Sequence, residues 1–447
     1  MKQYVENIKS YIQNIGQFAI ERCGPEEQMG LEFKGESSSF IRFNRSKVRQ
    51  VTHVEQCHLS ITFLQGGRTS HYNLSITFDE VSDRAKIQSA ISSLKKETKL
   101  LPEDPHQVLF ENSSVSENVN QGQLKNVDEL MDLVLKPLGE LDVAGYVSNG
   151  PIYRASINSE GQNHFYYGEN FFVDFSLFDS KQNAVKGFYG GNEWNQTKYL
   201  EEVNRCKEFL AKMSMEKKDV PRGKYRAYFA PAAVNDFVSM FGWHGISLKA
   251  IKHNRSAFCK IYNNERQLSP KFNFSENFAL GLGPQFNSRG EVSDEKIELI
   301  KDGKLENVLV SSRSSKEFGE KTNGADTHES PRSPYVAAGK LKEEDILKEI
   351  GTGLYISNIH YLNWSDVLSG RLTGMTRYAC FWVENGEIVG PIKDLRFDES
   401  FYNFFGDQLV DLTEETETFP NISTYGQRSV GGACVPGILV NNFTFTL

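Results

Sequence analysis

The stretch 380-CFWVENGEIVGPIKDLRF-397 decides the architecture of the second half of the chain. Two short apolar segments flank Asn385-Gly386, a dipeptide that favours a two-residue hairpin turn. The stretch 297-IELIKDGKLENVLV-310 repeats this arrangement around Asp302-Gly303. Because strands joined by such turns run antiparallel, we predict a strand-rich C-terminal domain over residues 221–447.

The N-terminal half is predicted to be a meander of strands with helices. Residues 29–78 alternate apolar and polar side chains between polar turns, and residues 79–98 return to helical spacing. The first 23 residues carry apolar side chains at helical spacing, which predicts an amphipathic core helix and not a signal peptide. These apolar residues are Val5, Ile8, Ile12, Ile15 and Ala19.

Strands outnumber helices and cluster along the sequence, which indicates an α+β fold and not an alternating parallel one. We expect an N-terminal α+β domain at 1–110 and a polar linker at 111–125. A central segment of the N-terminal region follows at 126–220, where Asn149-Gly150 predicts another hairpin. The C-terminal domain begins at 221.

Composition excludes several classes of function. The 447 residues carry a formal net charge of −8, which disfavours broad binding to nucleic acid or to an anionic membrane. No apolar run approaches the ~18 residues of a membrane span. The six cysteines lack CxxC spacing, so reduced thiols and a cytoplasmic location are expected.

The stretch 234-VNDFVSMFGWHGISLKAI-251 contains one side chain of metal-ligand type, His244. A zinc hydrolase typically needs three protein ligands and a carboxylate that takes a proton from the bound water. Ser239 and Met240 stand five and four residues before His244, and methionine is a poor zinc ligand that cannot act as a base. This stretch alone therefore lacks the groups for zinc catalysis.

Other reactive side chains in the sequence are explained by burial or by strand geometry. His53 and Cys57, with His58 beside them, lie four residues apart on one strand, too far apart for one ion. Cys380 and Cys259 lie in apolar segments, where thiols are usually inert.

Residues 357–379 are unusually rich in aromatic and hydrogen-bonding side chains. Either they line a cleft that grips a peptide backbone, or they form a polar loop between strands with one or two buried ion pairs. The residues we single out for substrate binding are His360, Tyr361, Asn363, Arg371, Thr373 and Arg377, with Trp364 and Asp366 beside them.

Several separated blocks resemble the TldD/PmbA family, the metallopeptidases also called modulators of DNA gyrase. The blocks are 281-GLGPQFNSRGEVSDEKIELIKDGKL-305, 351-GTGLYISNIHYLN-363, 369-SGRLTGMTRYACFWVENGEIVGPIKDLRF-397 and 436-PGILVNNF-443. Weaker similarity extends upstream over most of the chain. The resemblance implies that the α+β fold ends in a C-terminal domain of the TldD/PmbA type.

That family is built as pairs, in which a TldD-like subunit resembles a zinc protease with an HExxxH motif and a later cysteine ligand. The TldE (PmbA) subunit shares the fold without the motif. Set against the motif, His244 falls on the second histidine, Ser239 on the first and Met240 on the glutamate. Cys434 lies near the position of the family's cysteine ligand, and whether it occupies that position stays open.

The resemblance thus implies a non-catalytic, TldE-like subunit that holds no metal or cofactor of its own. Zinc is expected in a TldD-like partner, and the complex is expected to cleave unfolded or small peptides, as in peptide maturation or antitoxin degradation. Two alternatives stay open. One is an autonomous homo-oligomeric peptide-binding protein, and the other is a hydrolase with a relocated site at Cys380 or at His244 with Cys434.

Overall fold

The computed structural model describes residues 2–243 and 245–446. The N-terminal region forms one seven-stranded sheet in the order β3-β2-β1-β5-β6-β4, with β7 also paired to β6. Its pairs are antiparallel except β4 with β6. Its strands are β1 (Glu27–Asn44), β2 (Lys47–Gln65), β3 (Arg68–Ile76), β4 (Val115–Asn120), β5 (Asp142–Asn158), β6 (Asn163–Phe178) and β7 (Ala184–Gly191).

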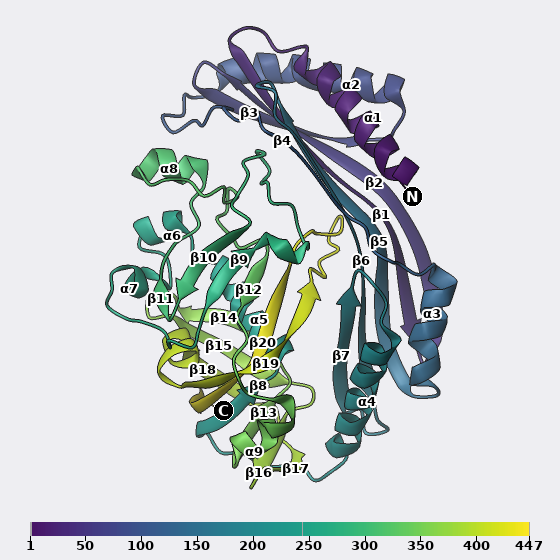
Figure 1. Cartoon of the computed structure of the whole chain (residues 1–447), viewed down its shortest axis with the longest axis vertical. Coiled ribbons are helices and arrows are strands. Elements are labelled where there is room, and N and C mark those ends of the chain that lie inside the picture. Colours follow the sequence, from purple (N-terminus) through teal and green to yellow (C-terminus); the bar gives the residue numbers. More distant parts are fainter. Residues whose placement is uncertain (1, 244, 447) are drawn as a thin grey trace.

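Four helices pack on this sheet, and they are α1 (Lys2–Ile20), α2 (Glu80–Glu97), α3 (Val127–Leu135) and α4 (Gln196–Met213). The apolar stripe of α1 is fully buried, as its spacing predicts. It packs with α2 against β1 to β3 in one apolar cluster. Figure 1 shows the sheet as a long curved layer, with α1 and α2 on its outer side and the C-terminal domain on the other.

The C-terminal domain is built on a thirteen-stranded sheet in which β20 is central, since it pairs with β8, β12, β18 and β19. The strands are β8 (Gly223–Phe229), β9 (Phe274–Asn277), β10 (Lys296–Lys301), β11 (Lys304–Leu305), β12 (Pro334–Val336), β13 (Gly353–Ile356), β14 (Asn358–Asp366), β15 (Arg371–Arg377), β16 (Phe381–Glu384), β17 (Glu387–Pro391), β18 (Arg396–Ser400), β19 (Leu409–Pro420) and β20 (Gly432–Phe445). The helices are α5 (Pro231–Ser239), α6 (Leu248–Lys252), α7 (Cys259–Tyr262), α8 (Ser312–Phe318) and α9 (Ile346–Ile350).

Both predicted C-terminal hairpins are present. Asn385 and Gly386 join β16 to β17 with φ angles of 51° and 83°, and Asp302 and Gly303 join β10 to β11 with 48° and 74°. Positive φ at both positions is the requirement of the turn that such dipeptides favour. The α+β assignment with a strand-rich C-terminal domain is confirmed.

The hairpin predicted at Asn149-Gly150 is wrong, because both residues lie inside β5. Gly150 has a φ of 143°, and a Cβ there would lie 2.2 Å from the carbonyl oxygen of Ser37. The glycine allows β5 and β1 to approach closely between the pairs Glu36–Ile152 and Ser39–Asn149, where the chain continues as a strand and does not reverse.

Residues 111–125, which the sequence predicts to be a linker, contain β4, and β4 pairs in parallel with β6. Segments 1–110 and 126–220 also share one sheet through the pairing of β1 with β5. One apolar cluster joins the two halves of the molecule, since α3, α4, β5 and β6 pack with residues of β8, β13 and β20. Within residues 2–243 and 245–446, no helix is long and apolar enough to cross a membrane.

Candidate functional site

The segment set against the family's HExxxH motif begins at the end of α5. Ser239 is the last residue of this helix, is exposed, and donates its hydroxyl to the carbonyl oxygen of Asp236 at 2.7 Å. Met240 opens a short 3-10 helix and is only 4% exposed, within the core cluster that contains Phe237 and Phe241. Ser239 thus faces solvent, and Met240 faces the core. His244 lies outside the described residues.

Asp236 is a carboxyl group on the same helix that sequence reasoning did not single out. Burial raises its pKa to about 7. A carboxyl of this kind holds a proton near neutral pH. No pattern in the sequence identifies Asp236, because its pKa is raised by the protein that surrounds the folded helix.

The segment 357–379 forms most of the antiparallel strand pair β14–β15. Its register sets Asn363 opposite Thr373, and it shifts between His360 and Asn363 where the chain bulges. Tyr361 sits at this bulge with a φ of 54° and is 79% exposed. The structure therefore brings these residues together on one pair of strands.

Several of these side chains are already engaged within the fold. Arg371 forms an ion pair with Asp398 at 2.7 Å, and Thr373 donates its hydroxyl to the carbonyl oxygen of Phe397 at 2.9 Å. Burial, followed by the nearby charge of Arg377, lowers the pKa of His360. The segment is thus a strand pair with one partly exposed ion pair, Arg371 with Asp398, while the side chain of Tyr361 is exposed.

The reactive side chains weighed from the sequence are placed as follows. His53 is exposed, whereas Cys57 is buried in the core beneath α1 and α2, and burial raises its pKa to about 12. Cys380 is buried as expected, and its pKa is raised to about 11. Cys259 is also buried. These thiols lack the exposed, electropositive setting that a nucleophile needs.

Cys434 lies on β20, opposite Thr418 of β19, and is 5% exposed. Its sulfur lies 3.3 Å from the hydroxyl oxygen of Thr416. In the described residues, no group of three or more His, Cys, Asp and Glu side chains is placed to hold a metal ion.

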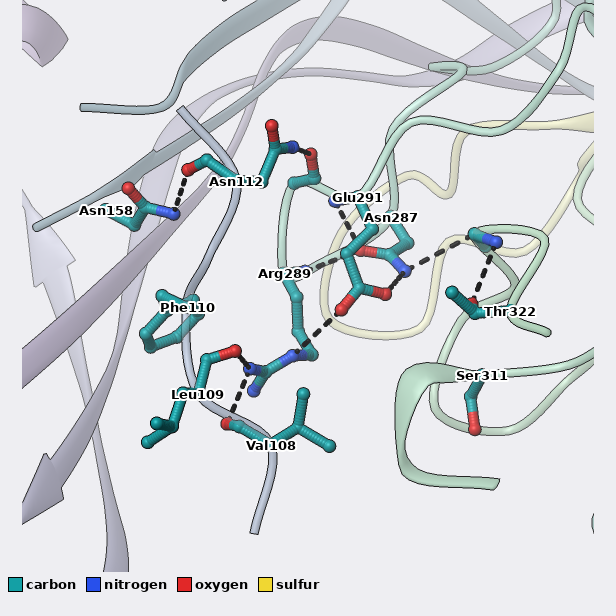
Figure 2. A network of polar contacts seen from close by, with 12 residues as sticks. Val108, Leu109, Phe110, Asn112, Asn158, Asn287, Arg289, Glu291, Ser311 and Thr322 are labelled. Carbon is teal, nitrogen blue, oxygen red and sulfur yellow. Dashed lines mark hydrogen bonds and ion pairs between the residues drawn. The ribbon is translucent and has the colours of Figure 1, made fainter. Parts of the chain in front are cut away.

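A cleft of about 460 Å³ lies between β1 to β3 and the loop around Arg289. Figure 2 shows the polar network beside it. The Arg289 guanidinium donates to the carbonyl oxygens of Val108 and Leu109 at 2.9 and 3.2 Å and lies over the ring of Phe110. Because one guanidinium nitrogen donates to these two carbonyls while Nε pairs with Glu291, this arginine clamps the N-terminal region to the C-terminal domain.

A larger cleft, of about 1010 Å³, opens between the two halves of the molecule. Its walls are α4, the end of β7, the outer part of β19 and residues 279–282. Sequence reasoning named none of these residues as a site. The cleft joins segments about 200 residues apart in the sequence, so no local pattern announces it.

Comparison with known proteins places this geometry in a family. The family model described as PmbA/TldA metallopeptidase C-terminal domain matches residues 222–447, just over half of the chain. The chain belongs to the PmbA/TldD family. This confirms the family expected from the separated sequence blocks, and the chain is a metallopeptidase-related protein of that family.

Two solved structures show that the PmbA/TldD fold extends over the whole chain. A proposed modulator of a DNA gyrase from Thermotoga maritima aligns with a TM-score of 0.78 at 16% identity, covering 98% of this chain and 100% of that one. TldE from Thermococcus kodakarensis aligns with a TM-score of 0.75 at 14% identity and the same coverage.

Sequence similarity to a curated PmbA/TldD relative is more local. The chain is 33% identical over 138 residues to the metalloprotease PmbA of Escherichia coli O157:H7. This match spans 31% of the chain and 29% of the length of that relative. The activity, substrates and partners of the whole relative are therefore matters for proposal.

Proposed function

We propose that this chain is a non-catalytic, TldE-like subunit that pairs with a TldD-like zinc metallopeptidase and helps to hold peptide substrates. The observation that carries the proposal is the pair Ser239 and Met240 at the HExxxH positions. A serine hydroxyl bonded to its own helix and a methionine in the core supply neither the first ligand nor the base.

The cleft between the two halves of the molecule supports the peptide-holding role. Its volume of about 1010 Å³ is large enough for several residues of an extended chain, and parts of its walls are strand edges. Strand edges recognise extended peptides through backbone hydrogen bonds, which tolerates many sequences. In this proposal the partner supplies zinc and its activated water, and this chain positions the substrate in a cytoplasmic complex.

Co-expression with the HExxxH-bearing homologue of the same host tests this proposal. The pair is expected to copurify, and cleavage of an unfolded peptide should require both chains. Replacing the motif glutamate of the partner by glutamine should abolish cleavage without separating the chains. Full cleavage by the partner alone, or failure of the two chains to copurify, would refute the subunit role.

One observation favours a second candidate, an autonomous peptide-binding protein. Two facing walls of the large cleft, α4 with the end of β7 on one side and the outer part of β19 on the other, belong to the same chain, so one copy offers a peptide both sides of the cleft. The same copurification experiment separates the two candidates, because an autonomous binder would elute without the homologue and still bind peptide. Burial of Cys380, with the raised pKa of its thiol, counts against a relocated thiol nucleophile.

A further inference from the structure

The large cleft runs along a strand edge of the C-terminal sheet and not over one of its faces. Four consecutive residues of β19, from Glu415 to Thr418, line it. Successive side chains of a strand point to opposite faces of a sheet, so consecutive residues can share one cleft only where it follows the edge. Residues 188–192 at the end of β7 line the opposite wall in the same consecutive manner.

The edge of β19 that faces the cleft is open. β19 pairs with β20 on one side, from Thr416 with Pro436 to Pro420 with Gly432. On its other side, a bridge to Leu341 ends at Thr413 and Glu414. Among residues 2–243 and 245–446, no strand pairs with that side of β19 over 415–420. The carbonyl oxygen of Glu415 accepts from the hydroxyl of Thr413 at 2.7 Å, and strand pairing leaves the outer backbone groups from Thr416 to Pro420 to a chain that enters the cleft.

The charge of the walls is one-sided. Seven glutamates line the cleft, against one lysine and one arginine. The arginine, Arg205, is already paired with Glu202 on α4, with Nε 2.9 Å from a carboxylate oxygen. None of the described residues forms an ion pair with Glu201, Glu208, Glu343, Glu415 or Glu417. Among the described residues, the cleft therefore presents more carboxylates than cations.

The surroundings of Glu417 disfavour the charged form of its carboxyl group. This side chain reaches solvent in the cleft, yet the enclosing protein raises its pKa to about 7. Burial is the largest cause, and Arg205 offsets part of it, while Glu202, Glu343 and Glu415 raise the pKa further. Glu415 and Glu417 are both exposed and both line the cleft, with Glu415 at the register shift of β19 between Leu412 and Thr416. A cation placed between them and α4 would relieve this repulsion.

We infer that the cleft binds an extended peptide segment carrying lysine or arginine side chains two residues apart, added as a strand to the open edge of β19 between Glu415 and Pro420. This inference rests on the proposed function and names the class of peptide that the subunit selects. Backbone hydrogen bonds to β19 hold the segment, and Glu415 and Glu417 read every second side chain. Six residues of strand span about 20 Å, which sets the length of the segment.

Binding of short labelled peptides to the purified full chain, followed by fluorescence anisotropy at low salt, tests the inference. Three six-residue peptides are compared. One alternates lysine with threonine, one alternates glutamate with threonine, and one has three lysines together followed by three threonines. The alternating lysine peptide should bind at least about tenfold more tightly than either of the others, because each paired charge contributes a modest, salt-sensitive gain.

Matched variants locate the site. The double variant Glu415→Gln with Glu417→Gln should weaken binding of the alternating lysine peptide by about tenfold. The control variant Glu295→Gln with Glu306→Gln makes the same charge change on exposed residues outside the cleft and should leave the affinity unchanged. Methylation of every second backbone nitrogen of the peptide should abolish binding when the methylated nitrogens are those that donate hydrogen bonds to β19. Thermal unfolding of each variant confirms that the fold is retained.

Equal affinity for the lysine and glutamate peptides would overturn the inference, and so would equal losses in the two double variants. Copurification with the HExxxH-bearing homologue is measured on the same preparations. If the homologue copurifies while the charge preference is absent, the inference fails and the proposed subunit role stands. If the charge preference is present and the homologue does not copurify, the subunit role fails and the cleft assignment stands.

Discussion

Phe188 on β7 stacks against Phe419 on β19, with ring centroids 5.4 Å apart and planes inclined by 29°. The contact joins the N-terminal sheet to the C-terminal sheet beside the cleft of about 1010 Å³, which Phe188 also lines. Figure 1 shows β7 and α4 running beside β19 and β20 at this junction. The two domains thus share an aromatic contact at the place where the proposed peptide would enter.

Phe188→Ala should therefore destabilise the junction. Loss of a large, partly buried ring from a packed contact removes apolar burial and leaves a cavity, at a cost of about 2–4 kcal/mol. Urea unfolding measures the free energy of unfolding. Tyr361→Ala is the matched control, because this aromatic ring is 79% exposed and its removal should change stability little. Equal effects of the two substitutions would contradict the assignment of Phe188 to the junction.

Arg428 anchors the segment that leads from β19 to β20 onto the N-terminal sheet. It is 1% exposed and donates to the hydroxyl of Ser38 and the carbonyl oxygen of Gly150, at 3.3 and 3.0 Å. It also donates to the side-chain oxygen of Asn170. Burial lowers its pKa to about 10, so the guanidinium stays charged at neutral pH.

Arg428→Met should leave these acceptors unsatisfied, lower stability by about 2–4 kcal/mol and expose residues 421–431 to protease. Limited proteolysis with mapping of the cleavage sites is the measurement. Arg428→Lys keeps the charge but not the planar fork of donors, and we expect it to recover part of the protection. Cleavage of wild type and Arg428→Met at the same rate would show that the anchor is elsewhere.

Asp236 should make stability depend on pH. Its folded pKa of about 7 lies above the ordinary value of 3.8, so the folded chain keeps a proton that the unfolded chain releases between about pH 4 and 7. This group therefore contributes less stability as pH rises through that window, and the loss is complete above pH 7. Asp236→Asn should remove this slope and raise stability at pH 8 by on the order of 2 kcal/mol. Parallel curves for the two proteins between pH 4 and 8 would contradict the buried carboxyl.

Restoring the metal motif at Met240 should destabilise the fold. Met240→Glu places a carboxylate where the side chain is 4% exposed and packs in the core, which costs about 2–4 kcal/mol without a partner for the charge. Ser239→His, at an exposed position, is the control and should be nearly neutral. Wild-type stability for Met240→Glu in thermal unfolding would show that position 240 faces the solvent.

The sequence predicts the local elements better than it predicts the site. Asn385-Gly386 forms the expected turn because the dipeptide itself meets the backbone requirement, and the stripe from Val5 to Ala19 is buried because its spacing is a property of one helix. Asn149-Gly150 fails because a close approach to Ser37 of β1, a tertiary contact, gives the same dipeptide another role.

The large cleft is beyond local prediction for a related reason. Glu202 and Glu417 lie more than 200 residues apart in the sequence, and each alone is an ordinary polar residue of a helix or a strand. Only the packing of the folded chain sets them in one cleft, where the charge of Glu202 raises the pKa of Glu417. The segment 357–379 was conspicuous because its polar and aromatic residues are contiguous. Their strand pair is present, but its role in substrate binding stays a prediction.

The most direct test of the central claim is the zinc content and peptidase activity of the purified chain, alone and with its HExxxH-bearing homologue. We predict no stoichiometric zinc and no cleavage of an unfolded peptide by the chain alone, with both appearing when the homologue is present. One zinc ion bound per chain together with peptide cleavage in the absence of the homologue would contradict the non-catalytic role assigned to Ser239 and Met240.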